Sequence, residues 1–141
     1  MHDQFFCRVC FDIITKLPSI YRDTGNLQDT VLRNVHASLD KLGVTSIYGL
    51  LLHNPNDILT YGSPLVDALK SLRDNGLVKK IGVSIYSPSI LDEVFAYFEP
   101  DIVQAPFNVI DRAILDSGWL KVLNSHGIEV HARSVFLQGL L

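Results

Sequence analysis

Five short apolar runs, separated by longer amphipathic stretches, are the feature of this 141-residue sequence that most limits its fold. The runs have the length of strands, and their apolar residues are mostly continuous, which indicates strands buried on both faces of a parallel sheet. Pro18 and Pro55 follow the first two runs and end them. We expect these strands at residues 11–16, 47–53, 80–84, 101–105 and 128–133.

The stretches between the runs have the periodicity of amphipathic helices. Between residues 27 and 42 the apolar side chains recur every three or four positions, and Gly43 supplies a natural C-terminal stop. Pro64 and Pro88 stand near the starts of the next two expected helices, and a fourth spans about residues 113–126. The predicted order βαβαβαβαβ indicates an α/β fold with a parallel sheet and right-handed crossovers.

Composition argues against several classes of protein. Hydrophobic residues make up 48% of the chain and charged residues 19%, so the chain has the composition of an ordinary globular protein. The formal net charge of −3 argues against a nucleic-acid partner, and no apolar run is long enough to span a membrane. Two cysteines cannot form a disulfide framework, so we expect a reducing, cytoplasmic compartment.

The two cysteines, Cys7 and Cys10, have the spacing of some redox and metal sites. A thioredoxin-type pair follows a strand, whereas this pair precedes the first expected one. A structural zinc site needs four ligands, and the sequence contains no second cysteine pair. We therefore expect no metal site, and we interpret residues 1–10 as an irregular extension in front of a domain at residues 11–141.

Chain length limits the architecture further. A complete (β/α)₈ barrel takes about 250 residues, so this chain cannot form one by itself. The apolar end at residues 135–141 has no closing helix, which leads us to expect a truncated segment. In such a segment the strands at residues 11–16 and 128–133 are open sheet edges, and we expect the chain to self-associate through them.

Polar residues gather at the predicted carboxyl ends of the strands. Lys16, His53, Ser84 and Arg133 stand at or near the ends of four runs, and Gln104 comes one residue before the end of the remaining run. Any one of them has a simple explanation, because strand ends reach solvent. Five chemically different residues at the edge where parallel α/β folds bind ligands indicate a functional site.

Four ordered motifs in the sequence resemble the aldo-keto reductase family. They include LLLHNP at residues 50–55, GLVKKIGVS at 76–84, QAPFNVIDR at 104–112 and QGLL at 138–141. The resemblance covers roughly the whole expected domain and implies strands three to seven of a TIM (β/α)₈ barrel, incomplete in this chain. It also implies NADPH-dependent reduction of an aldehyde or ketone, with a small-molecule carbonyl compound as the substrate.

The resemblance assigns roles to the residues at the strand ends. Lys16 matches the family lysine, whose ammonium lowers the pKa of a catalytic tyrosine, and His53 matches the histidine that stabilises the developing oxyanion. Ser84 and Gln104 match residues that hydrogen-bond the nicotinamide carboxamide. Arg133 departs from the family, because a tyrosine commonly stacks under the nicotinamide at this position. Its guanidinium could stack there instead, or bind an anionic group of cofactor or substrate.

The family's catalytic tetrad also contains an aspartate and a tyrosine upstream of the lysine, and no tyrosine of this sequence precedes Lys16. The resemblance therefore implies a catalytically incomplete chain. One alternative is a non-catalytic α/β module, derived from such a barrel, that serves binding or assembly. Another is an independent flavodoxin-like sheet that binds a phosphorylated small molecule, although the sequence lacks a phosphate-cradling loop and a final helix for that fold.

Overall fold

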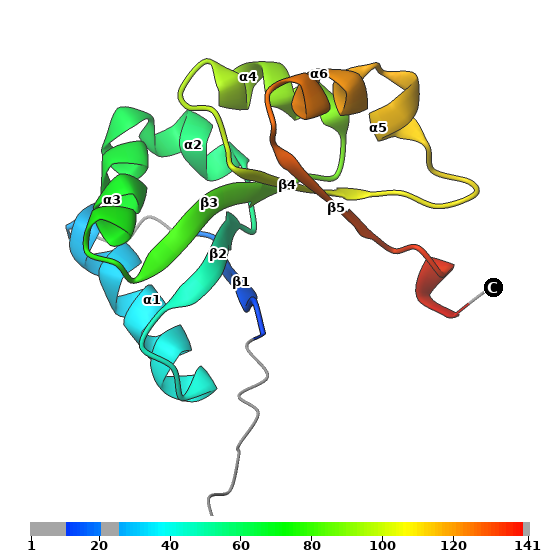
Figure 1. Cartoon of the computed structure of the whole chain (residues 1–141). Coiled ribbons are helices and arrows are strands. Elements are labelled where there is room, and N and C mark those ends of the chain that lie inside the picture. Colours follow the sequence, from blue (N-terminus) through cyan, green and yellow to red (C-terminus); the bar gives the residue numbers. More distant parts are fainter. Residues whose placement is uncertain (1–10, 21–25, 140–141) are drawn as a thin grey trace, which may run out of the picture.

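The structure is a computed structural model that describes residues 11–20 and 26–139. These residues form one sheet of five parallel strands in the order β1-β2-β3-β4-β5, so each strand pairs with its neighbours in the sequence (Figure 1). The predicted α/β class and parallel sheet are confirmed, while Cys7 and Cys10 lie outside the described residues. The strands are β1 (Ile14–Leu17), β2 (Ile47–Leu52), β3 (Val78–Ser84), β4 (Ile102–Pro106) and β5 (Glu129–Arg133).

Helices connect the strands, and Figure 1 shows them on one face of the sheet. They are α1 (Leu27–Leu42), α2 (Asn56–Tyr61), α3 (Ser63–Asp74), α4 (Leu91–Phe95), α5 (Ala113–Asp116) and α6 (Trp119–Ser125), with 3₁₀ turns η1 (Pro88–Ile90) and η2 (Leu137–Gly139). Within the described ranges, no helix has both the length and the apolar character that crossing a bilayer requires.

Helix α1 has the bounds that the sequence predicts, because both of its ends are capped. The Asn26 side chain accepts a hydrogen bond from the backbone N–H of Gln28, which satisfies a donor in the first turn. Gly43 follows the last turn at φ +66°, a left-handed conformation that favours glycine. Between these caps Val31 and Val35 lie on the buried stripe of the helix.

The structure moves the first strand from residues 11–16 to 14–17 and begins the third at residue 78 instead of 80, and it corrects the predicted helices in three places. The expected helix at residues 113–126 is two helices, because Gly118 adopts φ +82° between α5 and α6. The helix expected after Pro88 is a 3₁₀ turn followed by the short α4. Helix α2 is not predicted from the sequence, because Pro55 is interpreted there only as the end of the preceding strand. In the structure Pro55 directly precedes α2.

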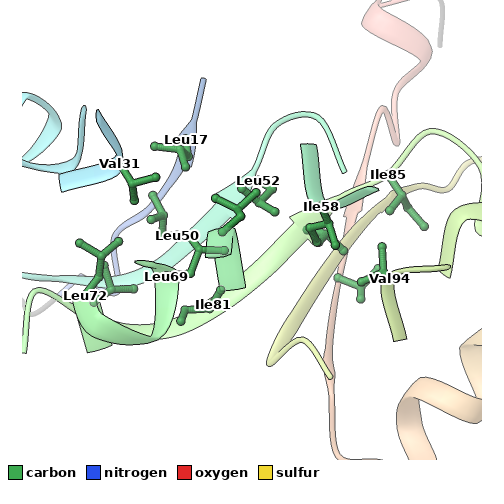
Figure 2. Close-up of a cluster of buried hydrophobic side chains, with 14 of the residues drawn as sticks. Leu17, Val31, Leu50, Leu52, Ile58, Leu69, Leu72, Ile81, Ile85 and Val94 are labelled. Carbon is green, nitrogen blue, oxygen red and sulfur yellow. The ribbon is translucent and has the colours of Figure 1, made fainter. Parts of the chain in front are cut away.

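The main hydrophobic core lies between the sheet and the helices. Leu50 and Leu52 of β2 and Ile81 of β3 point toward the helix layer, where they meet Leu69 and Leu72 of α3 (Figure 2). All five side chains are almost completely buried. Burial of each such side chain stabilises the fold by about 1.5–3 kcal/mol, so this layer fixes which face of every strand points inward.

The opposite face of the sheet carries no helix in the described part of the chain, and we call it the inner face. Gly49 and Gly82 allow close packing there. A Cβ atom at Gly82 would lie 2.1 Å from the carbonyl oxygen of Ile102 and 2.7 Å from Leu51 Cδ2. The backbones of β3 and β4 therefore approach so closely that only glycine fits at this position.

Strands β1 and β5 form the two edges of the described sheet, as the sequence predicts. Each edge strand has a neighbour on one side only, so its other row of backbone groups faces away from the sheet. Self-association through these edges stays a prediction.

The close approach at Gly82 predicts an unequal pair of substitutions. We expect Gly82→Ala to lower the free energy of unfolding by about 3 kcal/mol, because the added methyl group meets a backbone carbonyl that cannot move alone. Gly49→Ala is the matched control: its Cβ would meet the end of the Ile102 side chain at 2.9 Å, which can rotate away. We expect Gly49→Ala to lower the free energy of unfolding by about 1 kcal/mol or less. Urea unfolding monitored by circular dichroism measures both values, and equal losses would contradict this account of the inner face.

Candidate active site

All five predicted site residues lie at the carboxyl edge of the sheet. Lys16 is the penultimate residue of β1, His53 directly follows β2, and Ser84 ends β3. Gln104 lies in β4 opposite Ser84, and Arg133 ends β5. Because the strands are parallel and paired in order, residues distant in sequence come together at this one edge.

Ser84 and Gln104 form a polar pair at the centre of this edge. The two residues are register partners in β3 and β4, and the Ser84 hydroxyl donates to Gln104 Oε1 over 3.3 Å. Ser84 is buried and Gln104 is half-buried. The pair leaves the Gln104 amide N–H groups as donors and the Ser84 oxygen as an acceptor. These complement the oxygen and the amino group of a carboxamide, so the pair fits a nicotinamide.

Arg133 is held in a defined position across the end of the sheet. Its Nη2 donates to the carbonyl oxygen of Ile85 over 3.0 Å, which carries the guanidinium from β5 past the end of β4. The guanidinium carbon lies 4.5 Å from the centre of the Tyr86 ring, a cation–π contact. Its Nε is buried without a hydrogen-bond partner. Tyr86 therefore lies against the guanidinium and hinders a planar ring from stacking there.

Lys16 lies within electrostatic reach of the same cationic side chain. It is half-buried, and burial, followed by the positive charge of Arg133, lowers the pKa of its ammonium below the ordinary value. Among the residues that the structure describes, no carboxylate forms an ion pair with Lys16 or Arg133. These two cations of the carboxyl edge are therefore not paired with a carboxylate of the described residues.

His53 is fixed through its backbone and exposed through its side chain. Its N–H donates to the carbonyl oxygen of Leu17 over 3.1 Å, which continues the pairing of β1 and β2 beyond the strands. In the described part of the chain, no hydrogen bond joins its ring to the other four site residues. The arrangement leaves the imidazole free to meet a ligand at the edge.

Sequence reasoning missed the residues that hold the segment after β1. The backbone N–H of Ile20 donates to Asp57 Oδ2 over 3.0 Å, and the Tyr61 hydroxyl donates to the carbonyl oxygen of Ile20 over 3.0 Å. Burial raises the pKa of Asp57, against the opposing effects of the hydrogen bonds from Ile20 and Asn54. The spacing of Asn54 and Asp57, a polar residue followed three positions later by an acid, is a helix-start signal that could have revealed α2.

Asn108 holds the other end of the edge, and the sequence analysis gave it no role. Its Nδ2 donates to the carbonyl oxygen of Ser134 over 3.2 Å, and its Oδ1 accepts from the N–H groups of Ile110 and Asp111. The side chain is buried. It therefore joins the loop after β4 to the residue that follows Arg133, which positions that arginine.

Comparison with known proteins identifies the family. Residues 11–141 match the model of the aldo/keto reductase family, which is nearly the whole chain. The chain belongs to the aldo/keto reductase family. The predicted resemblance to this family is therefore confirmed.

Individual aldo/keto reductases match a similar stretch. The NADH-specific methylglyoxal reductase of Escherichia coli is 30% identical over 132 residues, which cover 87% of this chain and 40% of that protein. The thermostable aldo-keto reductase Tm1743, solved with the inhibitor epalrestat, superimposes with a TM-score of 0.74 at 25% identity, over 92% of this chain and 46% of that one. The holo form of AKR11C1 from Bacillus halodurans shares the fold, with a TM-score of 0.75 at 20% identity, over 92% and 45%. The chain thus spans less than half the length of these proteins, as an incomplete barrel does.

The hydroxyls of Tyr48 and Tyr61 form hydrogen bonds away from Lys16 and His53. Tyr48 donates to Glu129, and Tyr61 donates to the backbone of Ile20. Tyr86 lies against Arg133, but in the described residues no hydrogen bond joins its hydroxyl to Lys16 or His53. The family's tyrosine acid thus has no counterpart among these contacts.

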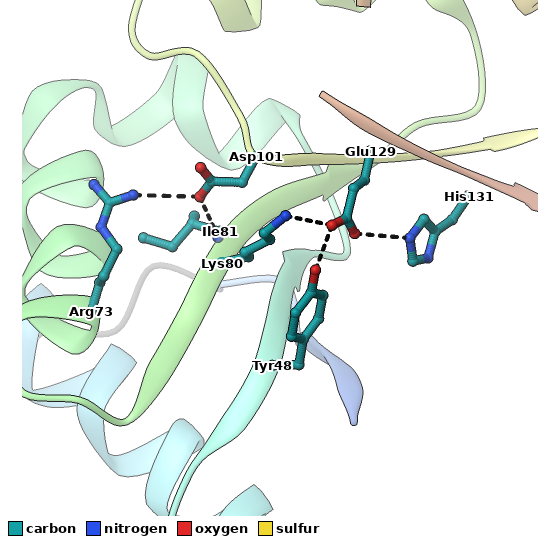
Figure 3. Close-up of polar contacts among 7 residues, drawn as sticks. All are labelled: Tyr48, Arg73, Lys80, Ile81, Asp101, Glu129 and His131. Carbon is teal, nitrogen blue, oxygen red and sulfur yellow. Dashed lines mark hydrogen bonds and ion pairs between the residues drawn. The ribbon is translucent and has the colours of Figure 1, made fainter. Parts of the chain in front are cut away.

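A second polar cluster lies toward the amino ends of the strands (Figure 3). The Tyr48 hydroxyl and the Lys80 ammonium both donate to the same Glu129 oxygen, and His131 Nε2 lies 3.3 Å from the other one. The hydrogen bonds from Lys80 and then Tyr48 lower the pKa of Glu129 to about 2, and the bond to Glu129 raises the pKa of Lys80. This cluster ties β2 and β3 to β5, across the intervening strand β4.

The lowered pKa of Glu129 predicts a pH-dependent contribution to stability. The ionised carboxylate stabilises the fold above the ordinary glutamate pKa of 4.5, and this contribution is lost as the pH falls toward about 2. We therefore expect the parent chain to be more stable than Glu129→Gln at pH 6, with a difference that shrinks between pH 4.5 and 2. Urea unfolding across this range measures it. The exposed Glu93→Gln should retain the pH dependence of the parent chain, and a parent–Glu129→Gln difference that is constant with pH would contradict the assignment.

Proposed function

We propose that this chain supplies the nicotinamide and carbonyl sites of an oxidoreductase that reduces an aldehyde or ketone with NADPH. The observation that carries the proposal is the Ser84–Gln104 pair, which complements a carboxamide and lies at the same sheet edge as Lys16 and His53. Membership of the aldo/keto reductase family supports the reaction class.

Four residues of this chain would bind the cofactor and stabilise the charge that develops during reduction. Ser84 and Gln104 hold the carboxamide and so orient one face of the nicotinamide ring, which supplies hydride when bound. His53 directs a ring N–H toward the carbonyl oxygen, where negative charge develops during reduction. The positive charge of Lys16 favours the same oxyanion and lowers the pKa of a neighbouring acid.

We propose NADPH as the cofactor because the family resemblance implies it, and a comparison of NADPH binding with NADH binding tests this preference. The Escherichia coli relative is named as NADH-specific, and that preference is a property of the relative. Stronger binding of NADH than of NADPH would correct the cofactor and leave the reaction class intact. The low cysteine content supports a reducing, cytoplasmic location for this chemistry.

We also propose that the described residues are catalytically incomplete, because they offer no tyrosine acid hydrogen-bonded to Lys16 or His53. General acid catalysis contributes about 10²–10⁴-fold to a rate, so its loss leaves little turnover. The same observation favours a second candidate function, a non-catalytic module that retains the cofactor site.

Cofactor binding tests the first part of the proposal. The parent chain should bind NADPH, and Gln104→Leu should weaken binding by about tenfold, because the carboxamide loses a hydrogen-bonding partner in a half-buried site. Isothermal titration calorimetry measures both dissociation constants. Gln28→Leu is the matched control, because Gln28 is exposed on α1 and the substitution is the same. Absence of binding to NADPH and NADH, or equal binding by parent and Gln104→Leu, would refute the assigned site.

Turnover separates the two candidate functions. We expect the chain to reduce methylglyoxal with NADPH or NADH at less than about 1% of the rate of the Escherichia coli reductase, because the general acid is missing. Cofactor oxidation followed at 340 nm measures this rate. A rate comparable to that of the reductase, abolished by His53→Ala in a variant that still binds cofactor, would establish a complete active site and reject the non-catalytic alternative.

A further inference from the structure

Arg133 is a charged group held in place at the carboxyl edge, and the carboxamide site does not use it. The carbonyl oxygen of Ile85 fixes one end of its guanidinium, and the ring of Tyr86 lies against it. Its Nε is buried without a partner, although charged donors at such sites are usually satisfied. Within the described residues no hydrogen bond is formed by Nη1 either. The side chain is therefore positioned with part of its donor set unused.

The positive charges of Arg133 and Lys16 favour the binding of an anion. Arg133 is near enough to Lys16 for its positive charge to disfavour the lysine ammonium, and the structure describes no carboxylate paired with either. Two uncompensated cations within electrostatic reach of each other repel, and an oxyanion bound at Arg133 would reduce this repulsion. A guanidinium presents its donors in a planar fork that matches the two oxygens of a carboxylate.

We propose that Arg133 binds the carboxylate of a 2-oxo acid and thereby selects an anionic carbonyl compound as the substrate. This inference rests on the proposed function, since it names the substrate class of that site. The location favours the substrate over the cofactor phosphates, because Arg133 lies within electrostatic reach of Lys16, the residue that we place near the reacting carbonyl oxygen. Contact with Tyr86 disfavours the alternative in which the guanidinium stacks on the nicotinamide.

The proposed reaction would transfer a hydride from the reduced nicotinamide to the carbonyl carbon of the 2-oxo acid. A C–H bond of the nicotinamide and the C=O π bond would break as the new C–H bond forms. The carbonyl oxygen would take one proton from solvent water, giving a 2-hydroxy acid and the oxidised cofactor. The carboxylate keeps its charge throughout, so its contact with Arg133 persists from substrate to product.

Binding without cofactor tests the inference separately from the proposed function. The probes are pyruvate and its neutral analogue pyruvamide, titrated into the whole chain at constant ionic strength and followed by NMR chemical shifts. We expect pyruvate to bind at least about tenfold more tightly than pyruvamide, the size expected for a charge-assisted pair. Arg133→Gln should abolish this preference, and Arg133→Lys should retain only part of it, because lysine keeps the charge and lacks the fork. Lys70→Gln, which removes the same charge on α3, should behave like the parent.

Every outcome of these titrations either supports or contradicts the proposed role of Arg133. Unfolding curves of Arg133→Gln and Arg133→Lys confirm that these variants remain folded, and the preserved binding of NADPH tests the carboxamide site independently. Equal binding of pyruvate and pyruvamide, no binding of pyruvate, or a preference that survives Arg133→Gln would overturn the assignment. A parallel titration with inorganic phosphate distinguishes the source of the anion. Tighter, Arg133-dependent binding of phosphate than of pyruvate would assign the arginine to a cofactor phosphate and reject the substrate carboxylate.

Discussion

Burial of one face of the sheet under helices determines where the polar residues of this chain can lie. Leu50, Leu52 and Ile81 occupy the helix-facing side almost without exposure, so residues of opposite parity in these strands point to the inner face. The parallel order of the strands then brings their carboxyl ends to one edge. A shift of one residue in register would exchange the two faces, and the site depends on this register for that reason.

The two ends of the strands carry two kinds of polar chemistry. Toward the amino ends, Lys80 and Tyr48 satisfy Glu129, so the charges there compensate one another across the sheet. At the carboxyl edge, Lys16 and Arg133 have no such compensation among the described residues. Compensated charge holds strands together, whereas uncompensated charge on positioned side chains is available to a ligand. This contrast is the physical basis for placing function at the carboxyl edge.

Much of the architecture could be predicted from local patterns, because apolar periodicity and helix stops are properties of neighbouring residues. The order of the strands and the site residues at their ends follow from these patterns and the rules for parallel sheets. The break between α5 and α6 at Gly118 could not be predicted, since the apolar stripe of the sequence continues past this residue. The roles of Asn108 and Glu129 depend on partners 26 to 81 residues away in sequence, and no local pattern specifies such partners.

NMR mapping of the bound nicotinamide tests the central claim, that ligands of this chain bind at the carboxyl edge of the inner face. Backbone amide shifts of the whole chain would be compared with and without NADPH. We expect the largest changes at Ser84 and Gln104, while Lys80 and Glu129 at the other end of the sheet stay unchanged. Changes centred on Lys80 and Glu129, or the absence of any change, would contradict it.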